Sequence, residues 1–335
     1  MIITVTPNPA WDVTYEVPAL VPGAVHRVTK VHRRLGGKGV NVARVLHATG
    51  HDAIAVLPGP SEGAAQLGLD APGAAAGPQL TWDVVPGLPV IRQTLVVQDA
   101  DGITTSLWEP GVKPDPGTDG ALAERVRAWL HADGRTGQAA RDLGTGTSQG
   151  VAASARGIVI SGSLPPGLDP RFHARLAAMA LDAAVPAVVD TSGEALAHAA
   201  TVPGVVLTPN SGELAELTGS ACHDPAEAIA AARALLAGGP LAVVVTLGEN
   251  GLAAVTRSGT WHGYLAEHLA GNPTGAGDAA AAALIAGLAA TANWPQIVRD
   301  AVSMSAAAVL SPVAGEVTLA NVARLRGQAM VREVA

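Results

Sequence analysis

The chain has 335 residues, of which 48% are hydrophobic, 15% are charged and only 3% are aromatic. A mean hydropathy of +0.30 excludes a disordered chain, and the glycines show no three-residue period, which excludes collagen. The net charge of −7, without any block of basic residues, argues against nucleic-acid binding. The length suits one large α/β domain or two smaller ones, with a core of Val, Leu, Ile and Ala.

The chain shows no sign of export or of a membrane span. Its single cysteine, Cys222, excludes an internal disulfide and is typical of a reducing compartment. The first residues lack the basic flank and long apolar stretch of a signal peptide, and the longest apolar segment, 279–290, is too short to cross a bilayer. The ten histidines show no metal-ligand spacing. We therefore expect a cytoplasmic protein without a dedicated zinc site.

Short apolar runs without alternation predict buried strands. They lie at 2–6, 53–57, 157–160, 187–189, 205–207 and 241–247. Helical patterns are predicted at 40–46, 171–183, 211–218, 226–237, 276–291 and 295–310. This alternation favours a parallel sheet covered on both faces.

Four stretches break this rhythm. Segments 14–31 and 90–107 contain β-rich, period-2 patterns that predict a small antiparallel sheet, for example a lid. Segments 61–78 and 132–156 are rich in Gly and Ala and are predicted to be surface excursions. Neither excursion resembles a domain boundary, so we expect a single domain over 1–335.

A glycine-rich turn, GNPTGAGD (271–278), opens the Ala-rich helix predicted at 276–291. Unpaired N–H groups and the helix dipole at such a start form an anion hole, and Asp278 could accept a proton from a hydroxyl there. Asp278 could equally be an ordinary helix-start residue. The pattern Gly275, Gly277, Ala280 also fits a dinucleotide fingerprint, although no apolar strand directly precedes it.

A second glycine-rich turn, RLGGKGVN (34–41), opens the helix predicted at 40–46. It is not a Walker A loop, because His32 and Gly39 replace the required Gly and Ser or Thr. Lys38, one of three lysines in the chain, is a candidate for neutralising phosphate charge, and Asn41 for binding a sugar hydroxyl. The alternative is a plain turn with a solvated lysine.

Polar residues also follow five of the predicted strands. They are Asp12, the segments 162–167 and 190–193, the pair Asn210 and Glu213, and the pair Gly248 and Gly251. Because ligands of open parallel sheets bind beyond the carboxyl ends of the strands, together they indicate a site at one edge of the sheet. A rival motif, GPSEG (59–63), fits the nucleophile elbow of α/β-hydrolases, but Pro60 beside the serine argues against it.

The chain resembles the ribokinase-like sugar kinases of the phosphofructokinase B type in seven segments: TPNPAWD, GGKGVNVARVL, SGSLPPG, VDTSGEAL, PNSGEL, VVVTLGENG and PTGAGDA. The branch it resembles contains 1-phosphofructokinase, 6-phosphofructokinase of that type and tagatose-6-phosphate kinase. The resemblance implies a three-layer α/β/α fold with a mainly parallel central sheet and a small β-sheet lid, formed by about 12–32 and 88–109. It implies ATP and Mg²⁺, and it leaves room for a homodimer through the lid.

The resemblance also implies roles for single residues. Asp278 would be the catalytic base, and the N–H groups of Gly275, Ala276 and Gly277 would stabilise the transferring phosphoryl group. The positions that match substrate-binding residues are Asp12, Gly36, Gly37, Lys38, Asn41 and Arg92, of which Arg92 would contact the substrate phosphate. The positions that match nucleotide-binding residues are Asn210, Thr246, Gly248 and Gly251. Glu213 would act on Mg²⁺ indirectly.

The favoured interpretation is a carbohydrate kinase that converts fructose 1-phosphate and ATP to fructose 1,6-bisphosphate. Alternatives are a 6-phosphofructokinase or tagatose-6-phosphate kinase, a kinase of an unphosphorylated sugar or nucleoside, and a non-catalytic sensor of sugar phosphate or nucleotide. Thr208 stands where relatives carry a lysine near the ATP phosphates. Thr208 therefore supports the interpretation as a non-catalytic sensor. In a kinase, Thr208 would leave Lys38 to neutralise more of the phosphate charge.

Overall fold

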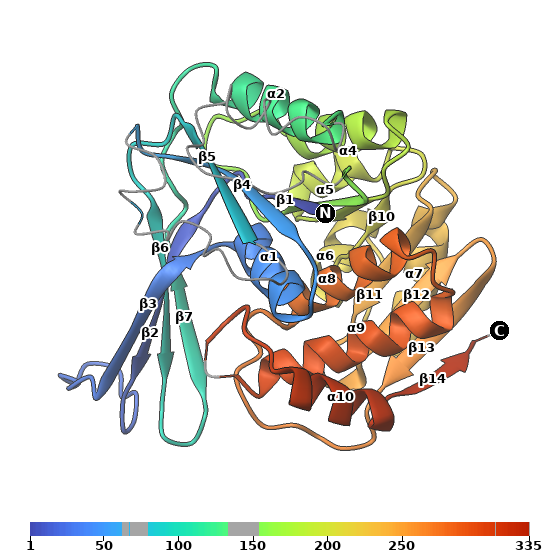
Figure 1. The fold of residues 1–335 in the computed structure, drawn as a ribbon. Helices are drawn as coiled ribbons and strands as arrows, with labels where there is room; N and C mark the ends of the chain where they lie inside the picture. The colour runs from blue at the N-terminus through green and yellow to red at the C-terminus, as the bar shows by residue number, and fades with distance from the viewer. Residues whose placement is uncertain (62–66, 68–79, 133–153, 312, 335) are drawn as a thin grey trace.

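The computed structural model describes residues 1–61, 67, 80–132, 154–311 and 313–334 (Figure 1). The predicted surface excursions at 61–78 and 132–156 lie almost entirely outside the described residues, as does the end of the GPSEG segment (59–63).

A ten-stranded sheet forms the body of the described structure, in the order β14-β13-β12-β11-β10-β9-β8-β1-β4-β5. One continuous part is parallel and consists of β5 (Leu80–Pro86), β4 (Ala53–Gly59), β1 (Ile2–Val5), β8 (Gly157–Ser161), β9 (Ala187–Asp190), β10 (Val206–Leu207) and β11 (Ala242–Thr246). The other part is antiparallel and consists of β12 (Leu252–Thr256), β13 (Gly259–Tyr264) and β14 (Met330–Glu333).

Every predicted buried strand is present in the parallel part. Strands β1, β4, β8 and β9 are buried along their whole length, which is why their sequences are almost entirely apolar. Strand β5 and the antiparallel strands were not predicted from the sequence. Strand β14 lies at the edge of the sheet and is mostly exposed, so its sequence carries no apolar run.

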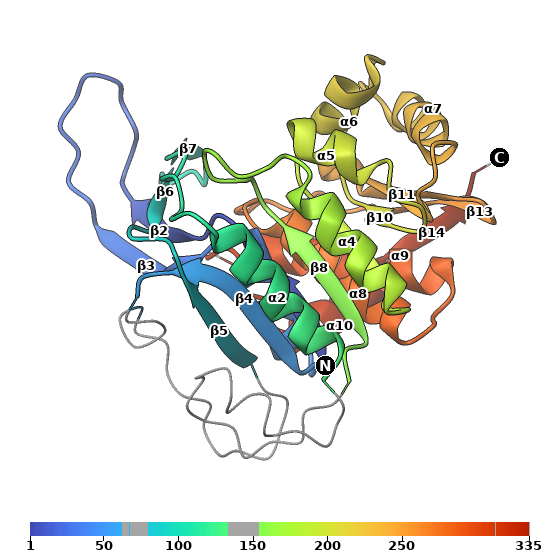
Figure 2. The same ribbon diagram turned by 90° about the horizontal axis from the view of Figure 1, so that it is seen from above.

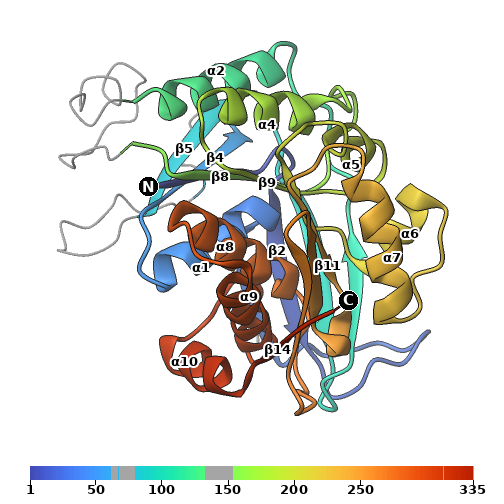
Figure 3. The ribbon, with the colours of Figure 1, turned by 90° about the vertical axis from the view of Figure 1, so that its right-hand side faces the viewer.

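Helices cover both faces of this sheet (Figure 3). One face carries α1 (Lys38–Ala48), α8 (Ala276–Ala289), α9 (Trp294–Val309) and α10 (Leu319–Gln328). The other carries α2 (Thr118–Leu130), α4 (Phe172–Asp182), α5 (Gly193–Ala199), α6 (Ser211–Thr218) and α7 (Pro225–Leu236). The predicted three-layer α/β/α fold is confirmed.

Successive strand residues alternate between these two layers. Ile158 packs with α2 and α4, whereas Val159 packs with α1 and α8. Small residues bring α8 close to the sheet: a Cβ on Gly157 would lie 2.7 Å from the side chain of Ile285. Close packing of this kind explains how a chain with few aromatic residues fills its core. No helix among the described residues is long and apolar enough to cross a membrane.

A smaller, four-stranded sheet stands beside the main body (Figures 1 and 2). Its order is β3 (Lys30–Gly36), β2 (Ala10–Glu16), β6 (Arg92–Gln98) and β7 (Thr104–Trp108). We predicted an antiparallel sheet, and this was wrong for one pair, because β2 and β6 run parallel. The chain leaves the small sheet after β3 and forms α1, β4 and β5. It then returns to the small sheet as β6, which lies beside β2 and runs in the same direction. That the sheet acts as a lid stays a prediction.

Candidate active site

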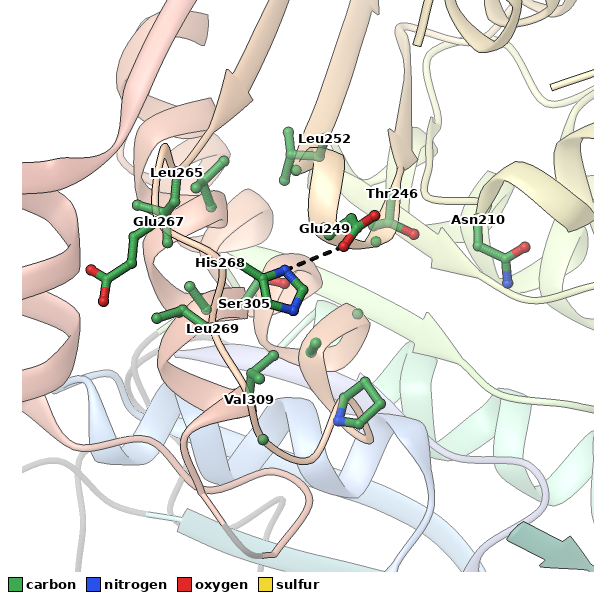
Figure 4. Close-up of a pocket in the computed structure, with 18 of the residues that line it drawn as sticks. Asn210, Thr246, Glu249, Leu252, Leu265, Glu267, His268, Leu269, Ser305 and Val309 are labelled. Carbon is green, nitrogen blue, oxygen red and sulfur yellow. Dashed lines mark ion pairs between the residues drawn. The ribbon is translucent and has the colours of Figure 1, made fainter. Parts of the chain in front are cut away.

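Two adjoining cavities meet at the N-terminus of α8. The first, of about 660 Å³, lies between the small sheet and the carboxyl ends of the parallel strands, and we call it the small-sheet cavity. The second, of about 450 Å³, lies between η2 (Gly248–Asn250), β12, α9 and the segment before α8, and we call it the α9 cavity (Figure 4). The residues that line both are Asn210, Thr246, Pro273 and Gly277.

The start of α8 places Asp278 at this junction. Gly275 is the N-cap residue, with a φ of 87°, and a Cβ there would lie 2.7 Å from the backbone nitrogen of Gly315. Asp278 in the first turn is only 5% exposed, and its Oδ2 accepts a hydrogen bond from Asn41 Nδ2 at 3.0 Å. The predicted glycine turn before a helix is therefore confirmed. The N–H of Ala276 donates to the carbonyl of Pro273 at 3.2 Å, so in this structure it is already engaged.

The pKa of Asp278 lies well above its ordinary value of 3.8. Burial raises its pKa to about 7, and the carboxylate of Asp190 acts in the same direction. The ammonium group of Lys38 and the hydrogen bond from Asn41 oppose this rise. A carboxyl group with a pKa near neutral is ionised in part at neutral pH and holds an accepted proton more strongly than an ordinary aspartate, which suits a general base.

Lys38 is the first residue of α1, after Gly37 with a φ of 103°. Its Nζ donates to Asp190 Oδ1 at 2.9 Å, and 39% of its side chain is exposed where it lines the small-sheet cavity. Burial lowers the pKa of Lys38, but the carboxylates of Asp190, Asp278 and Glu213 outweigh burial, so its pKa is raised and it stays a cation. Lys38 is therefore part of a charge cluster rather than a solvated turn residue.

Asp12 faces the same cavity from the middle of β2. It was expected after a strand of the main sheet, whereas it lies within the small sheet. Its Oδ1 accepts from Thr94 Oγ1 at 2.6 Å, and its Oδ2 accepts from Asn41 Nδ2 at 3.4 Å. A Cβ on Gly36 would lie 1.9 Å from Asp12 Oδ2, so this glycine makes room for the carboxylate. Asn41 thus connects Asp12 to Asp278.

Arg92 lies at the start of β6 and lines the small-sheet cavity. Its Nη1 donates to the carbonyl oxygen of Glu109 at 2.7 Å. Its Nε is buried and has no hydrogen-bond partner within the described part of the chain. Burial lowers the pKa of Arg92, and Asp12 and Glu109 oppose that effect.

Asn210 and Glu213 form a reciprocal capping box at the start of α6. Glu213 N donates to Asn210 Oδ1, and Asn210 N donates to Glu213 Oε2, both at 2.9 Å. Both residues also line the small-sheet cavity, so the helix cap holds them there. Thr208 is buried, and its hydroxyl donates to the carbonyl of Val189 at 3.3 Å.

The α9 cavity contains the other predicted nucleotide residues. Thr246 ends β11, Gly248 is the first residue of the short 3₁₀ helix η2, and Gly251 directly follows it. Gly251, with a φ of 80°, lies against β13, since a Cβ would be 2.1 Å from the carbonyl oxygen of Gly263. Glu249 Oε2 and His268 Nδ1 lie 3.2 Å apart on the wall of this cavity, and Figure 4 draws the two side chains facing each other.

The structure brings most of the predicted site residues to these two cavities. The small-sheet cavity is lined by Asp12, Gly37, Lys38, Asn41, Arg92, Asn210, Glu213, Thr246, Gly275, Gly277 and Asp278. The α9 cavity is lined by Asn210, Thr246, Gly248, Gly251, Ala276 and Gly277. Gly36 lines neither cavity and packs on Asp12.

Sequence reasoning missed several lining residues. They include Asn8, Thr94 and Trp108 in the small-sheet cavity and Leu252, Leu265, His268 and Val309 in the α9 cavity. These residues lie in no glycine-rich motif, and the apolar ones are indistinguishable in sequence from core residues. In the sequence, Asp190 is only one of many polar residues that follow strands.

Comparison with known proteins identifies the family. The family model described as pfkB family carbohydrate kinase matches residues 136–320. An ATP-dependent 6-phosphofructokinase isozyme 2 of Mycobacterium tuberculosis is 33% identical over 93% of this chain and 84% of its own length. This chain belongs to the pfkB family of carbohydrate kinases. Membership of the pfkB kinase family also accounts for the glycine turn before α8 without a dinucleotide site.

Two further relatives agree with this assignment. A 1-phosphofructokinase of Xanthomonas campestris is 32% identical and covers 86% of this pfkB kinase and 83% of its own chain. The solved structure of phosphofructokinase-2 from Escherichia coli in complex with fructose-6-phosphate is 26% identical, with a TM-score of 0.78, and covers 97% of this chain and 98% of its own. The resemblance to the phosphofructokinase B type, and with it the prediction of a carbohydrate kinase, is confirmed.

Proposed function

We propose that this kinase transfers the γ-phosphoryl group of ATP to a hydroxyl of a hexose phosphate, with fructose 1-phosphate as the leading substrate and fructose 1,6-bisphosphate as the product. The observation that carries the proposal is Asp278, a buried carboxyl group with a pKa of about 7 at the junction of two cavities. The names of the relatives, ATP-dependent 6-phosphofructokinase and 1-phosphofructokinase, support ATP as donor and a phosphorylated hexose as acceptor.

The proposed reaction uses both cavities. The sugar binds in the small-sheet cavity beside Asp12 and Asn41, and the nucleotide binds in the α9 cavity with its phosphates at the start of α8. Asp278 accepts the proton of the sugar hydroxyl while that oxygen bonds to the γ-phosphorus. The bond from phosphorus to the bridging oxygen breaks, and ADP leaves with the electron pair. Phosphoryl transfer depends on positioning and charge stabilisation, which Lys38 and the N-terminus of α8 supply.

The residues fit a Mg²⁺ ion that is carried mainly by the nucleotide. Asp190 Oδ2 is buried and finds no hydrogen-bond partner among the described residues, and Glu213 lines the same cavity. Proteins bind Mg²⁺ through one or two carboxylates together with substrate phosphates and water. Asp190 and Glu213 are the carboxylates that would hold the ion, and Glu213 would act indirectly because its Oε2 already accepts from Asn210. A bound Mg²⁺ supplies positive charge beside the phosphoryl oxygens.

The substrate assignment is tested by the release of ADP from ATP with fructose 1-phosphate, fructose 6-phosphate, tagatose 6-phosphate and unphosphorylated fructose, each with and without Mg²⁺. We expect Mg²⁺-dependent release that is fastest with fructose 1-phosphate. Fructose 6-phosphate is the second candidate, because the M. tuberculosis relative is named a 6-phosphofructokinase. Release that occurs only with unphosphorylated fructose would contradict the proposal.

Arg92→Ala should weaken the binding of the substrate phosphate. A hydrogen bond to a charged group contributes about 1.5–3 kcal/mol, so KM for the hexose phosphate should rise roughly 10- to 100-fold while kcat changes little. The matched control is Arg33→Ala, because Arg33 lies on β3 and packs over the ring of Trp11 at 4.6 Å outside the cavity lining. Steady-state kinetics with varied sugar phosphate measure the effect, and equal KM values for the two variants would argue for a neutral sugar.

We also propose a homodimer through the small sheet. The face opposite the cavity carries two exposed apolar residues, Val31 on β3 and Leu107 on β7. A tetrameric inhibited form has been solved for the phosphofructokinase-2 of E. coli. A monomeric mass in sedimentation at assay concentrations would contradict the dimer.

A further inference from the structure

Trp108 is an exposed aromatic residue on the wall of the small-sheet cavity. It ends β7 and is 66% exposed, whereas the other five tryptophans of the chain are buried or half-buried. A tryptophan side chain contributes a large apolar area when it is covered, so an indole left open on a cavity wall is available for a ligand.

The strand register places Trp108 beside the substrate residues. Asp12 on β2 pairs with Thr94 on β6, and Thr94 pairs with Trp108 on β7. Residues paired in this way lie in one row on one face of the sheet. Since Asp12, Thr94 and Trp108 all line the cavity, this row forms its wall.

Spacing along the row leaves room for a sugar against the indole. Neighbouring strands are about 4.8 Å apart, so the backbone at Trp108 lies roughly 10 Å from that at Asp12. Between them stands only Thr94, whose short hydroxyl side chain is already bonded to Asp12 Oδ1 at 2.6 Å. A ligand held by the Asp12 carboxylate therefore has the indole on its flank.

We propose that Trp108 is a substrate-binding residue whose indole packs against the C–H-bearing face of the hexose phosphate. This rests on the proposed function, because it requires a sugar in the small-sheet cavity. Sugar rings present C–H groups on one face, and the negative face of an aromatic ring attracts the positive edge of such groups. Covering the indole also removes apolar surface from water. The contact binds the sugar before and during transfer, so it acts on affinity rather than on the chemical step.

The kinetic test compares Trp108→Ala, Trp108→Phe and a control, Ile103→Ala. Ile103 is 65% exposed just before β7 but does not line the cavity. For Trp108→Ala we expect KM for the hexose phosphate to rise roughly tenfold, with kcat and KM for ATP within about twofold of the wild type. Trp108→Phe should recover most of the affinity, and Ile103→Ala should match the wild type. An unchanged sugar KM in Trp108→Ala would overturn the proposal.

A second measurement does not depend on turnover. Fructose 1-phosphate and fructose 6-phosphate are titrated into the wild type and Trp108→Phe without ATP, with tryptophan fluorescence and calorimetry as readouts. We expect a fluorescence change in the wild type that is lost in Trp108→Phe. Equal calorimetric affinity for the sugar phosphate in the wild type and Trp108→Ala would overturn the inference. If Trp108→Ala also differed from the wild type in sedimentation mass, Trp108 would act in subunit association and not in sugar binding. If neither sugar phosphate binds or turns over in the wild type, the proposed function itself fails.

Discussion

Replacing Asp278 with Asn is expected to reduce kcat roughly 10²- to 10⁴-fold, the usual contribution of a positioned general base. The amide cannot take the proton of the sugar hydroxyl, but it has the size of the carboxyl group and can still accept from Asn41 Nδ2, which lies 3.0 Å from Asp278 Oδ2. Steady-state ADP release at saturating substrates measures the loss. Turnover within a few-fold of the wild type would remove Asp278 from the mechanism.

The same variant carries a second expectation, on stability. Because the pKa of Asp278 is raised to about 7 in the folded protein, from an ordinary value of 3.8, the folded state holds the proton more strongly than the unfolded state. The raised pKa of Asp278 therefore stabilises the folded state fully below about pH 3.8, and this stabilisation is lost as the pH rises through about 7. Asp278→Asn should therefore have a higher Tm than the wild type at pH 8, and the difference should shrink toward pH 5.

The wild-type enzyme should show the corresponding pH dependence. The base must be ionised to accept a proton, so kcat/KM should fall as the pH drops below about 7. A profile that stays flat down to pH 5, together with a lower Tm for Asp278→Asn at pH 8, would show that burial does not raise this pKa.

Most of the parallel part of the main sheet and the helix that carries Asp278 could be predicted from sequence, for physical reasons. Strands buried on both faces are apolar at most positions, so they are recognisable as nearly continuous apolar runs. A glycine turn before a helix is also a local pattern, and Gly37 and Gly275 both precede helices in positive-φ conformations. Edge strand β14 is mostly exposed, and no local pattern predicted it.

The charge cluster of the site could not be predicted, because it depends on pairs far apart in the chain. The partner of Lys38 is Asp190, 152 residues away, and Asp278 is 237 residues from Asn41. Sequence reasoning found three of these residues as separate candidates and had no means of pairing them. The contact between Gly36 and the Asp12 carboxylate is likewise a long-range feature, and the role of Gly36 in substrate binding stays a prediction.

The capping box at Asn210 shows that a structural and a functional interpretation can hold together. The pattern Asn-x-x-Glu predicts a helix start on general grounds, and the two reciprocal 2.9 Å bonds confirm it. The same geometry directs Glu213 to the wall of the small-sheet cavity. Burial raises the pKa of Glu213, while Lys38 and the N–H of Asn210 lower it, so the cap and the charge cluster share one carboxylate.

Lys38→Met should have the second large effect on catalysis. Lys38 is the cation that faces Asp190, Asp278 and Glu213, and the buried residue 208 is Thr, which adds no charge. Removing one preorganised group that stabilises developing charge costs roughly 10²- to 10³-fold in kcat, and we expect a loss of this size. Methionine keeps the length and apolar stem of the side chain, so the change isolates the charge.

The pH profile distinguishes this role from simple damage to the fold. Lys38 lowers the pKa of Asp278, so without its charge that pKa should rise above about 7 and the acid limb of kcat/KM should move to higher pH. The control is Lys30→Met, because Lys30 on β3 is exposed and its Nζ lies 3.8 Å from Glu16, outside the cavity lining. That variant should keep both the rate and the profile of the wild type. A lower kcat in Lys38→Met with an unchanged acid limb would mean that Lys38 binds phosphate without changing the pKa of Asp278. If kcat and the acid limb both matched the wild type, other groups would neutralise the phosphate charge.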